Sequence, residues 1–236
     1  MTVLQALSEC KAVLFDVDGT LADTVPIIAA GLGDTFEEFS GTRPDDGFLR
    51  SIIGRPLHDQ MNLLGLGESA PHEVQDRVQF AMDRFRHHQS RSRLFEPAVL
   101  AMHQLRGAGK RIGLVTSKNR VELREFLDQF PALSQVDSVI AAEDAAHPKP
   151  AGDPAEAACH QLQVTPAEAI LIGDSAFDLE CAASAGVRSI GVTYGAGTVG
   201  QLAKWHPLAM FDTPEALLEA IQQSLEIPYA KTESNH

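Results

Sequence analysis

Short unbroken apolar runs alternate with amphipathic stripes along most of this chain. The runs that predict buried strands are 12–15, 111–116, 136–142, 169–173 and 187–192. Between them, apolar residues recur at helical spacing, and a Gly or Pro ends most of the stripes. Strands that alternate with helices at short spacing predict a parallel sheet with right-handed crossovers.

The alternation stops directly after the first strand. From Thr24 to Phe95 the apolar residues follow helical spacing only, and we expect no strand there. Thr24, with Pro26 close behind it, is the expected N-cap of the first helix, and glycines at 65–67 are expected to end a later one. The sequence therefore predicts an α/β fold, a doubly wound, Rossmann-like parallel sheet with an inserted all-helical cap. The expected boundaries are 1–22 and 96–228 for the core, 23–95 for the cap and 229–236 for a disordered tail.

Polar residues follow the predicted strands at the points where those strands end. These residues are Asp16 and Asp18, then Thr116 and Ser117, then Lys149 between two prolines, then Asp174 and Asp178. Ligands of open α/β sheets bind outside the carboxyl ends of the strands, so we expect these side chains to meet in one cleft. Four carboxylates in one cleft are costly without a bound cation, and the all-oxygen set indicates Mg²⁺. The hydroxyls and the lysine suit the oxygens of a phosphate.

Each of these groups also has an ordinary structural explanation. Asp18-Gly19 is a common turn signal, and Thr116 could cap the helix that follows it. Lys149 could be an exposed loop lysine, while Asp174 and Asp178 could stabilise a helix dipole. Their coincidence after successive buried strands favours a site.

Charge and cysteine content narrow the class of protein. A formal net charge of −13 argues against nucleic acid or an anionic membrane as a partner, so a phosphate site must be locally positive. Cys10, Cys159 and Cys181 fit no zinc motif and no disulfide framework, which predicts reduced thiols in a cytoplasmic protein. No segment approaches ~18 consecutive apolar residues, and the N-terminal segment lacks the features of a signal peptide, so no membrane association is expected.

The ordered set of motifs resembles the four motifs of the haloacid dehalogenase superfamily. The motifs are Asp16-Val17-Asp18-Gly19-Thr20, Thr116, Lys149 and Gly173-Asp174 with Asp178. The resemblance runs from about residue 11 to residue 194, and the helical insertion is similar to the cap of the phosphoglycolate phosphatase-like branch.

This resemblance implies a phosphatase that works through an aspartyl-phosphate. Asp16 would attack phosphorus, and Asp18 would act as general acid and then as general base. Thr116, Ser117 and Lys149 would bind the phosphoryl oxygens. Mg²⁺ would be held by the Asp16 carboxylate, the Asp18 backbone carbonyl and Asp174, with Asp178 behind them. Asp18 favours phosphate hydrolysis over dehalogenation, because a halide leaving group needs no proton.

These motifs do not identify the substrate. A small phosphorylated metabolite such as 2-phosphoglycolate is expected, and Arg55, between Gly54 and Pro56, is a candidate contact for its carboxylate. The alternatives are a sugar phosphomutase with the same cap type, a pyrophosphatase, or a receiver-like phosphoacceptor module that is not an enzyme. The oligomeric state does not follow from the sequence.

Overall fold

The computed structural model describes residues 2–63, 70–88 and 91–227. The glycines at 65–67 and the tail at 229–236, for which the sequence predicts a helix end and disorder, lie outside these ranges.

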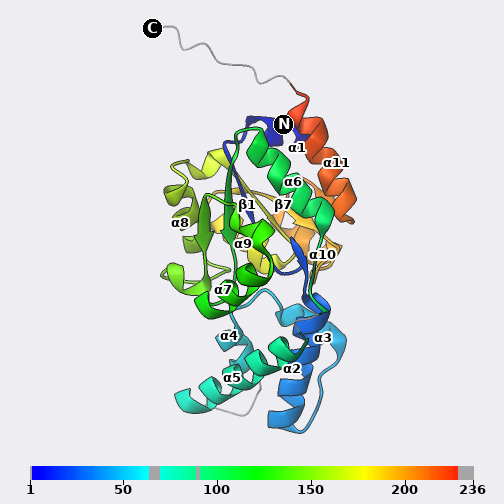
Figure 1. The fold of residues 1–236 in the computed structure, drawn as a ribbon, viewed down its shortest axis with the longest axis vertical. Helices are drawn as coiled ribbons and strands as arrows, with labels where there is room; N and C mark the ends of the chain where they lie inside the picture. The colour runs from blue at the N-terminus through cyan, green and yellow to red at the C-terminus, as the bar shows by residue number, and fades with distance from the viewer. Residues whose placement is uncertain (1, 64–69, 89–90, 228–236) are drawn as a thin grey trace.

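The larger part of the molecule is built on a six-stranded parallel sheet with the order β5-β4-β1-β6-β7-β8 (Figure 1). Its strands are β1 (Ala12–Phe15), β4 (Arg111–Val115), β5 (Ser138–Ile140), β6 (Ala169–Gly173), β7 (Arg188–Val192) and β8 (Met210–Phe211). β1 lies in the middle, with β4 on one side and β6 on the other. The predicted doubly wound α/β fold is confirmed, and the crevice of such a sheet lies at the carboxyl end of β1.

Helices cover both faces of the sheet. Val13 and Phe15 belong to a core that includes residues of α1 (Val3–Glu9), α6 (Glu96–Gly107) and α11 (Pro214–Leu225). Ala12 and Leu14 belong to the opposite core, which includes residues of α8 (Asp153–Gln161) and α9 (Ala176–Ser184). Because β1 is buried on both sides, each of its positions is apolar, which explains the unbroken run in the sequence.

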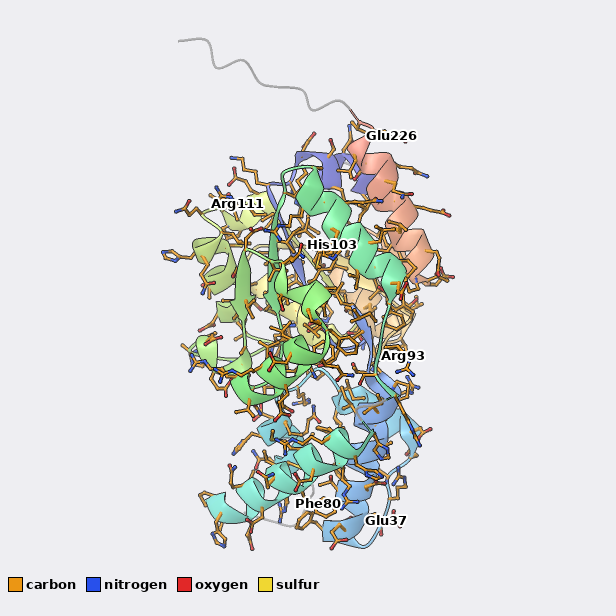
Figure 2. All side chains as sticks on the ribbon, in the orientation of Figure 1. Glu37, Phe80, Arg93, His103, Arg111 and Glu226 are labelled. Atoms are coloured by element: carbon orange, nitrogen blue, oxygen red, sulfur yellow. The ribbon has the colours of Figure 1, made fainter. Side chains whose placement is uncertain are left out.

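The insertion after β1 forms a separate helical layer at one end of the molecule (Figure 1). Its helices are α2 (Val25–Ser40), α3 (Asp46–Ile52), α4 (Leu57–Asn62) and α5 (Pro71–His88). Leu32, Leu49 and Met61 are fully buried in its own core. Figure 2 shows Glu37 and Phe80 at the end of this layer that is remote from the sheet.

A two-stranded antiparallel ribbon joins the two layers. β2 (Ala22–Asp23) pairs with β3 (Arg93–Leu94), and Arg93 lies at the junction of the layers (Figure 2). The expectation that no strand precedes Phe95 is therefore wrong for Arg93–Leu94. Two residues show no periodicity of their own, and their partners lie some seventy positions earlier in the chain, so only the fold brings the pair together.

The predicted strand at 136–142 is also too long, since only Ser138–Ile140 pairs with β4. The chain turns there into a 3₁₀ helix, η3 (Ala142–Asp144), which the Asp144 carboxylate stabilises by accepting a hydrogen bond from the Ala141 N–H at 2.9 Å. The remaining elements are α7 (Arg120–Gln129), α10 (Val199–Leu202), η2 (Pro131–Ser134), η4 (Pro166–Glu168) and η5 (Ala203–Trp205). Within the described ranges, no helix has the length and apolarity that a membrane span would need.

Candidate active site

A buried lysine and two carboxylates form the floor of the site. Asp16 directly follows β1, and its Oδ1 accepts a hydrogen bond from Lys149 Nζ at 2.8 Å. The same ammonium donates to Asp178 Oδ1 at 2.5 Å and to the Val115 carbonyl at 2.6 Å. Only 2% of Lys149 is exposed, so the loop that carries it aims its charge into the site rather than into solvent.

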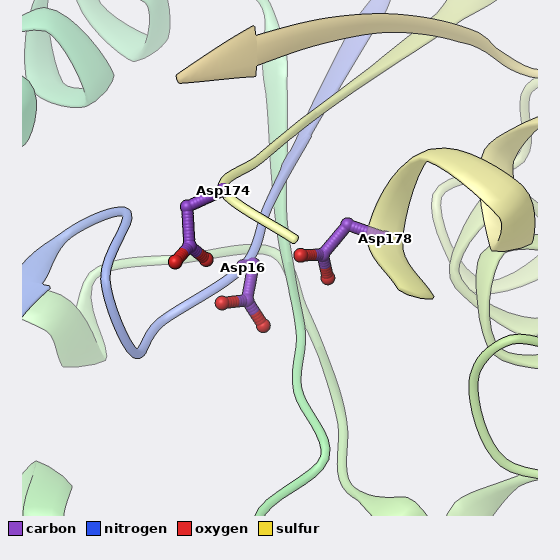
Figure 3. A group of neighbouring side chains, drawn as sticks. All are labelled: Asp16, Asp174 and Asp178. Carbon is purple, nitrogen blue, oxygen red and sulfur yellow. The ribbon is translucent and has the colours of Figure 1, made fainter. Parts of the chain in front are cut away.

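Three buried carboxylates converge at this floor (Figure 3). Asp16, Asp174 and Asp178 each offer an oxygen, and these oxygens lie within 4.8 Å of one another. Asp174 is held by hydrogen bonds from the Thr20 hydroxyl at 3.3 Å and from the Ala196 N–H at 2.6 Å. The Asp16 and Asp174 oxygens remain close enough to bind one ion together.

Asp178 is more fully engaged with the protein. Its Oδ1 accepts from Lys149, and its Oδ2 accepts from the Ser175 N–H at 3.0 Å and from the Ser175 hydroxyl at 2.6 Å. Ser175 is the N-cap of α9, so the capping box of this helix fixes the carboxylate in place. Asp178 therefore positions the lysine.

The electrostatics of the floor favour a further positive charge. Burial, together with the nearby Asp178 carboxylate, raises the pKa of Asp16 to about 7. Burial and the charges of Asp178 and Asp16 raise the pKa of Asp174 well above its usual value. Burial alone would lower the pKa of Lys149, but Asp16 and Asp178 outweigh it and hold that pKa above its usual range. One ammonium among three carboxylates leaves an excess of negative charge that a divalent cation fits.

Two loops pack tightly around the Asp174 carboxylate because each has a glycine, which carries no side chain, at the point of contact. Gly19 has φ +79, and a Cβ there would lie 2.1 Å from Asp174 Oδ2. A Cβ at Gly195 would lie at the same distance from the same oxygen. Both positions require glycine because the carboxylate is enclosed by backbone.

Asp18 lies outside the carboxylate cluster and points into the cleft. Its Oδ1 accepts from the Thr24 hydroxyl at 2.6 Å, and its Oδ2 lies 2.9 Å from Lys118 Nζ. Thr24 occupies the N-cap position of α2 as expected, but its side chain makes no capping hydrogen bond. Its hydroxyl instead donates to Asp18.

Lys118 is a site residue that the sequence reasoning missed. Its ammonium lies over the ring of Phe126 at 5.0 Å and beside the Asp18 carboxylate. The signal available was its position directly after Ser117, in the loop at the end of the second predicted strand. From the sequence alone, Lys118 cannot be distinguished from a lysine in an exposed loop.

The two hydroxyls of this loop are used differently. Thr116 is 2% exposed, and its Oγ1 accepts a hydrogen bond from the Lys118 N–H at 3.2 Å. The Ser117 hydroxyl donates to the Gly54 carbonyl at 2.6 Å. Ser117 thus binds the helical layer to the sheet layer in the described conformation.

Two further contacts hold the helical layer over the sheet. The Arg55 guanidinium lies 4.8 Å from the centre of the Phe177 ring at the start of α9. Arg86 on α5 donates to both oxygens of Glu125 on α7, at 3.0 and 3.2 Å. Between the layers is a cavity of about 110 Å³, lined by Asp16, Asp18 and Lys118 and by residues of the helical layer that include Arg55.

A buried lysine and converging carboxylates that lie below a helical layer are groups that a phosphoryl-transfer hydrolase needs. The family of haloacid dehalogenase-like hydrolases has a sequence model that matches residues 13–192, so the chain belongs to that family. The resemblance stated from the motifs is confirmed.

Relatives of known name place the protein more closely within this family. It is 28% identical to the pyrophosphatase PpaX of Bacillus velezensis over 88% of this chain and 94% of the relative. It is 32% identical to a phosphoglycolate phosphatase of Cupriavidus necator over 88% of this chain and 91% of the relative. A crystal structure of a hydrolase from Pseudomonas syringae, 20% identical, has the same fold with a TM-score of 0.79, over 90% of this chain and 98% of that one. The protein is a phosphatase of the haloacid dehalogenase-like family.

Proposed function

We propose that the protein is a Mg²⁺-dependent phosphatase that hydrolyses a small phosphate monoester, such as 2-phosphoglycolate, through an aspartyl-phosphate on Asp16. The observation that carries this proposal is the position of Asp16. Its carboxylate lines the cleft, while a buried ammonium holds its Oδ1 at 2.8 Å. A carboxylate fixed in this way is oriented for in-line attack on phosphorus.

In the first step, an Asp16 oxygen forms a bond to phosphorus while the bond to the ester oxygen breaks. Asp18 donates its proton to that departing oxygen. In the second step, Asp18 accepts a proton from water, whose oxygen attacks phosphorus and releases the Asp16 carboxylate with inorganic phosphate. Lys149 and the Thr116–Ser117 loop would bind the phosphoryl oxygens through their N–H groups and hydroxyls.

The residues present fit Mg²⁺ better than a softer metal. The donor set consists of carboxylate oxygens, and no His or Cys belongs to the cluster found among the described residues. Asp16, Asp174 and the Asp18 backbone carbonyl would hold the ion, with Asp178 behind them on Lys149. When bound, Mg²⁺ would supply positive charge to the phosphoryl oxygens.

Two variants of the first loop test these roles. Asp16→Asn removes the nucleophile, so release of inorganic phosphate from any ester should fall to background. Asp18→Asn keeps the nucleophile but removes the proton donor, so turnover should fall by roughly 10²–10⁴-fold, most for poor leaving groups. Substantial turnover by Asp16→Asn would overturn the proposed mechanism.

Arg55 is the proposed contact for a carboxylate on the substrate. It lines the cavity, and its Nε is buried without a hydrogen-bond partner in the described part of the chain. Arg55→Ala should raise KM for 2-phosphoglycolate and leave the turnover of p-nitrophenyl phosphate nearly unchanged. Equal damage to both substrates would assign Arg55 a structural role in cap closure.

Inorganic pyrophosphate is the second candidate substrate, because a relative named as a pyrophosphatase matches most of the chain. A phosphate-release panel should therefore include pyrophosphate, 2-phosphoglycolate and a hexose phosphate. Isomerisation of the hexose phosphate faster than its hydrolysis would favour a mutase. We further propose a cytoplasmic location, which three buried free cysteines support.

A further inference from the structure

We propose that the leaving group of the natural substrate is a small alcohol whose hydrocarbon part lies against an apolar wall of the cavity. This inference rests on the proposed phosphatase function and concerns the substrate class of the same site. It comes from the walls of the cavity beyond Asp18, from the charges already paired there, and from the size of the space.

The cavity walls contributed by the helical layer are mostly apolar. They include Ile27, Ile28, Ile53, Leu57, Met82 and Phe85. Phe126 on α7 adds an aromatic ring from the opposite side. Ile28 and Phe85 are only half-buried although they belong to the packed helical layer, so part of their hydrocarbon surface is left for a ligand.

Two of the charged side chains that line this part of the cavity already have carboxylate partners. Lys118 lies 2.9 Å from Asp18, and Arg86 binds Glu125 through two hydrogen bonds. The lining side chains keep two buried polar atoms without hydrogen bonds in the described chain, Gln60 Oε1 and Arg55 Nε. Each further substrate hydroxyl that is buried without a partner costs about fivefold or more in binding.

The space is also small. Its volume is about 110 Å³, below the roughly 150 Å³ of an apolar cavity that holds benzene. The phosphoryl group must occupy the end next to Asp16, so the rest suits a short alkyl chain.

A homologous series of n-alkyl phosphates, from methyl to butyl, tests the inference on the wild-type enzyme with Mg²⁺. Each added methylene that reaches the wall should raise kcat/KM for phosphate release about fourfold until the cavity is filled. 2-Hydroxyethyl phosphate has nearly the shape of n-propyl phosphate but ends in a hydroxyl. It should be poorer than n-propyl phosphate by about fivefold or more.

A matched pair of variants tests whether the apolar wall of the cavity selects for alkyl chain length. Ile28→Thr places a hydroxyl on the apolar wall, so the gain per methylene should shrink. Val121→Thr is a similar exchange on the outer surface of α7, where Val121 is 56% exposed. This variant should keep the wild-type gain in kcat/KM per methylene. Phe85→Ala enlarges the same wall, so the best substrate should move to a longer chain, which provides a second test if Ile28→Thr does not fold.

This inference would be overturned if kcat/KM stayed constant or fell along the n-alkyl phosphates, or if it were equal for 2-hydroxyethyl and n-propyl phosphate. Either result would leave the phosphatase function intact. Absence of phosphate release from every ester would instead overturn the proposed function, and this inference with it.

Discussion

We expect activity to require closure of the helical cap over the cavity, and Gly54 offers a test of this expectation. It has φ +101, and its carbonyl accepts the Ser117 hydroxyl that ties the two layers together. In Gly54→Ala, the new Cβ would lie 2.7 Å from Ser175 Oγ and 2.9 Å from Phe177 Cδ2. Ser175 cannot simply turn away, because its hydroxyl is bound to Asp178 at 2.6 Å.

Two separate costs follow from this geometry. The left-handed backbone costs alanine about 1–2 kcal/mol whether the cap is open or closed. The overlap with Ser175 and Phe177 arises only in the closed state and costs about 1–3 kcal/mol more. The second cost lowers the population of the closed state, so kcat/KM should fall roughly 5- to 150-fold.

Gly41→Ala is the matched control. Gly41 has φ +73 at the end of α2, and a Cβ there meets no atom within 4 Å. Urea unfolding should show a loss of about 1–2 kcal/mol in both variants, since both carry the backbone strain. Steady-state assays should show the loss of kcat/KM in Gly54→Ala only. Equal kinetics for the two variants would refute the closure argument.

Three further outcomes are expected. Lys149→Met leaves the buried carboxylates of Asp16 and Asp178 without their ammonium and should lower the free energy of unfolding by about 3–5 kcal/mol at pH 8. This loss should shrink towards pH 5, where Asp16, with its raised pKa, takes up a proton, and an unchanged urea midpoint would contradict the buried ion pair. Mg²⁺ should raise the thermal midpoint of the wild type and of the surface variant Asp46→Asn, but not that of Asp174→Asn. If Mg²⁺ still raises the thermal midpoint of Asp174→Asn, Asp174 does not belong to the metal site. Burial raises the pKa values of Cys159 and Cys181 to about 11, so the unfolded thiols lose protons before the folded ones, and the free energy of unfolding should fall as the pH rises from about 9 to about 11. If the difference in urea midpoint between the wild type and Cys181→Ala stays constant over that range, the thiols are not buried as described.

The features that could be predicted from the sequence are those encoded by neighbouring residues. The apolar run before Asp16 marks β1 because that strand is buried on both faces, and the residues after it must then lie at the ligand-binding edge. The same logic gives Asp174 at the end of β6, where prediction and structure agree on the strand at 169–173. The helical insertion was visible because helical periodicity repeats over many residues.

The fold alone decided which partner each side chain meets. Lys118 reaches Asp18 across about 100 positions of the chain, and Arg86 reaches Glu125 across 39. No local pattern records such a pair. The ribbon of Arg93–Leu94 with Ala22–Asp23 arises in the same way. Local sequence determines periodicity, caps and turns, because those depend on residues within one or two turns of the chain. The paired charges, the glycine contacts around Asp174 and the apolar cavity depend on packing between distant segments, and therefore only the tertiary structure determines them.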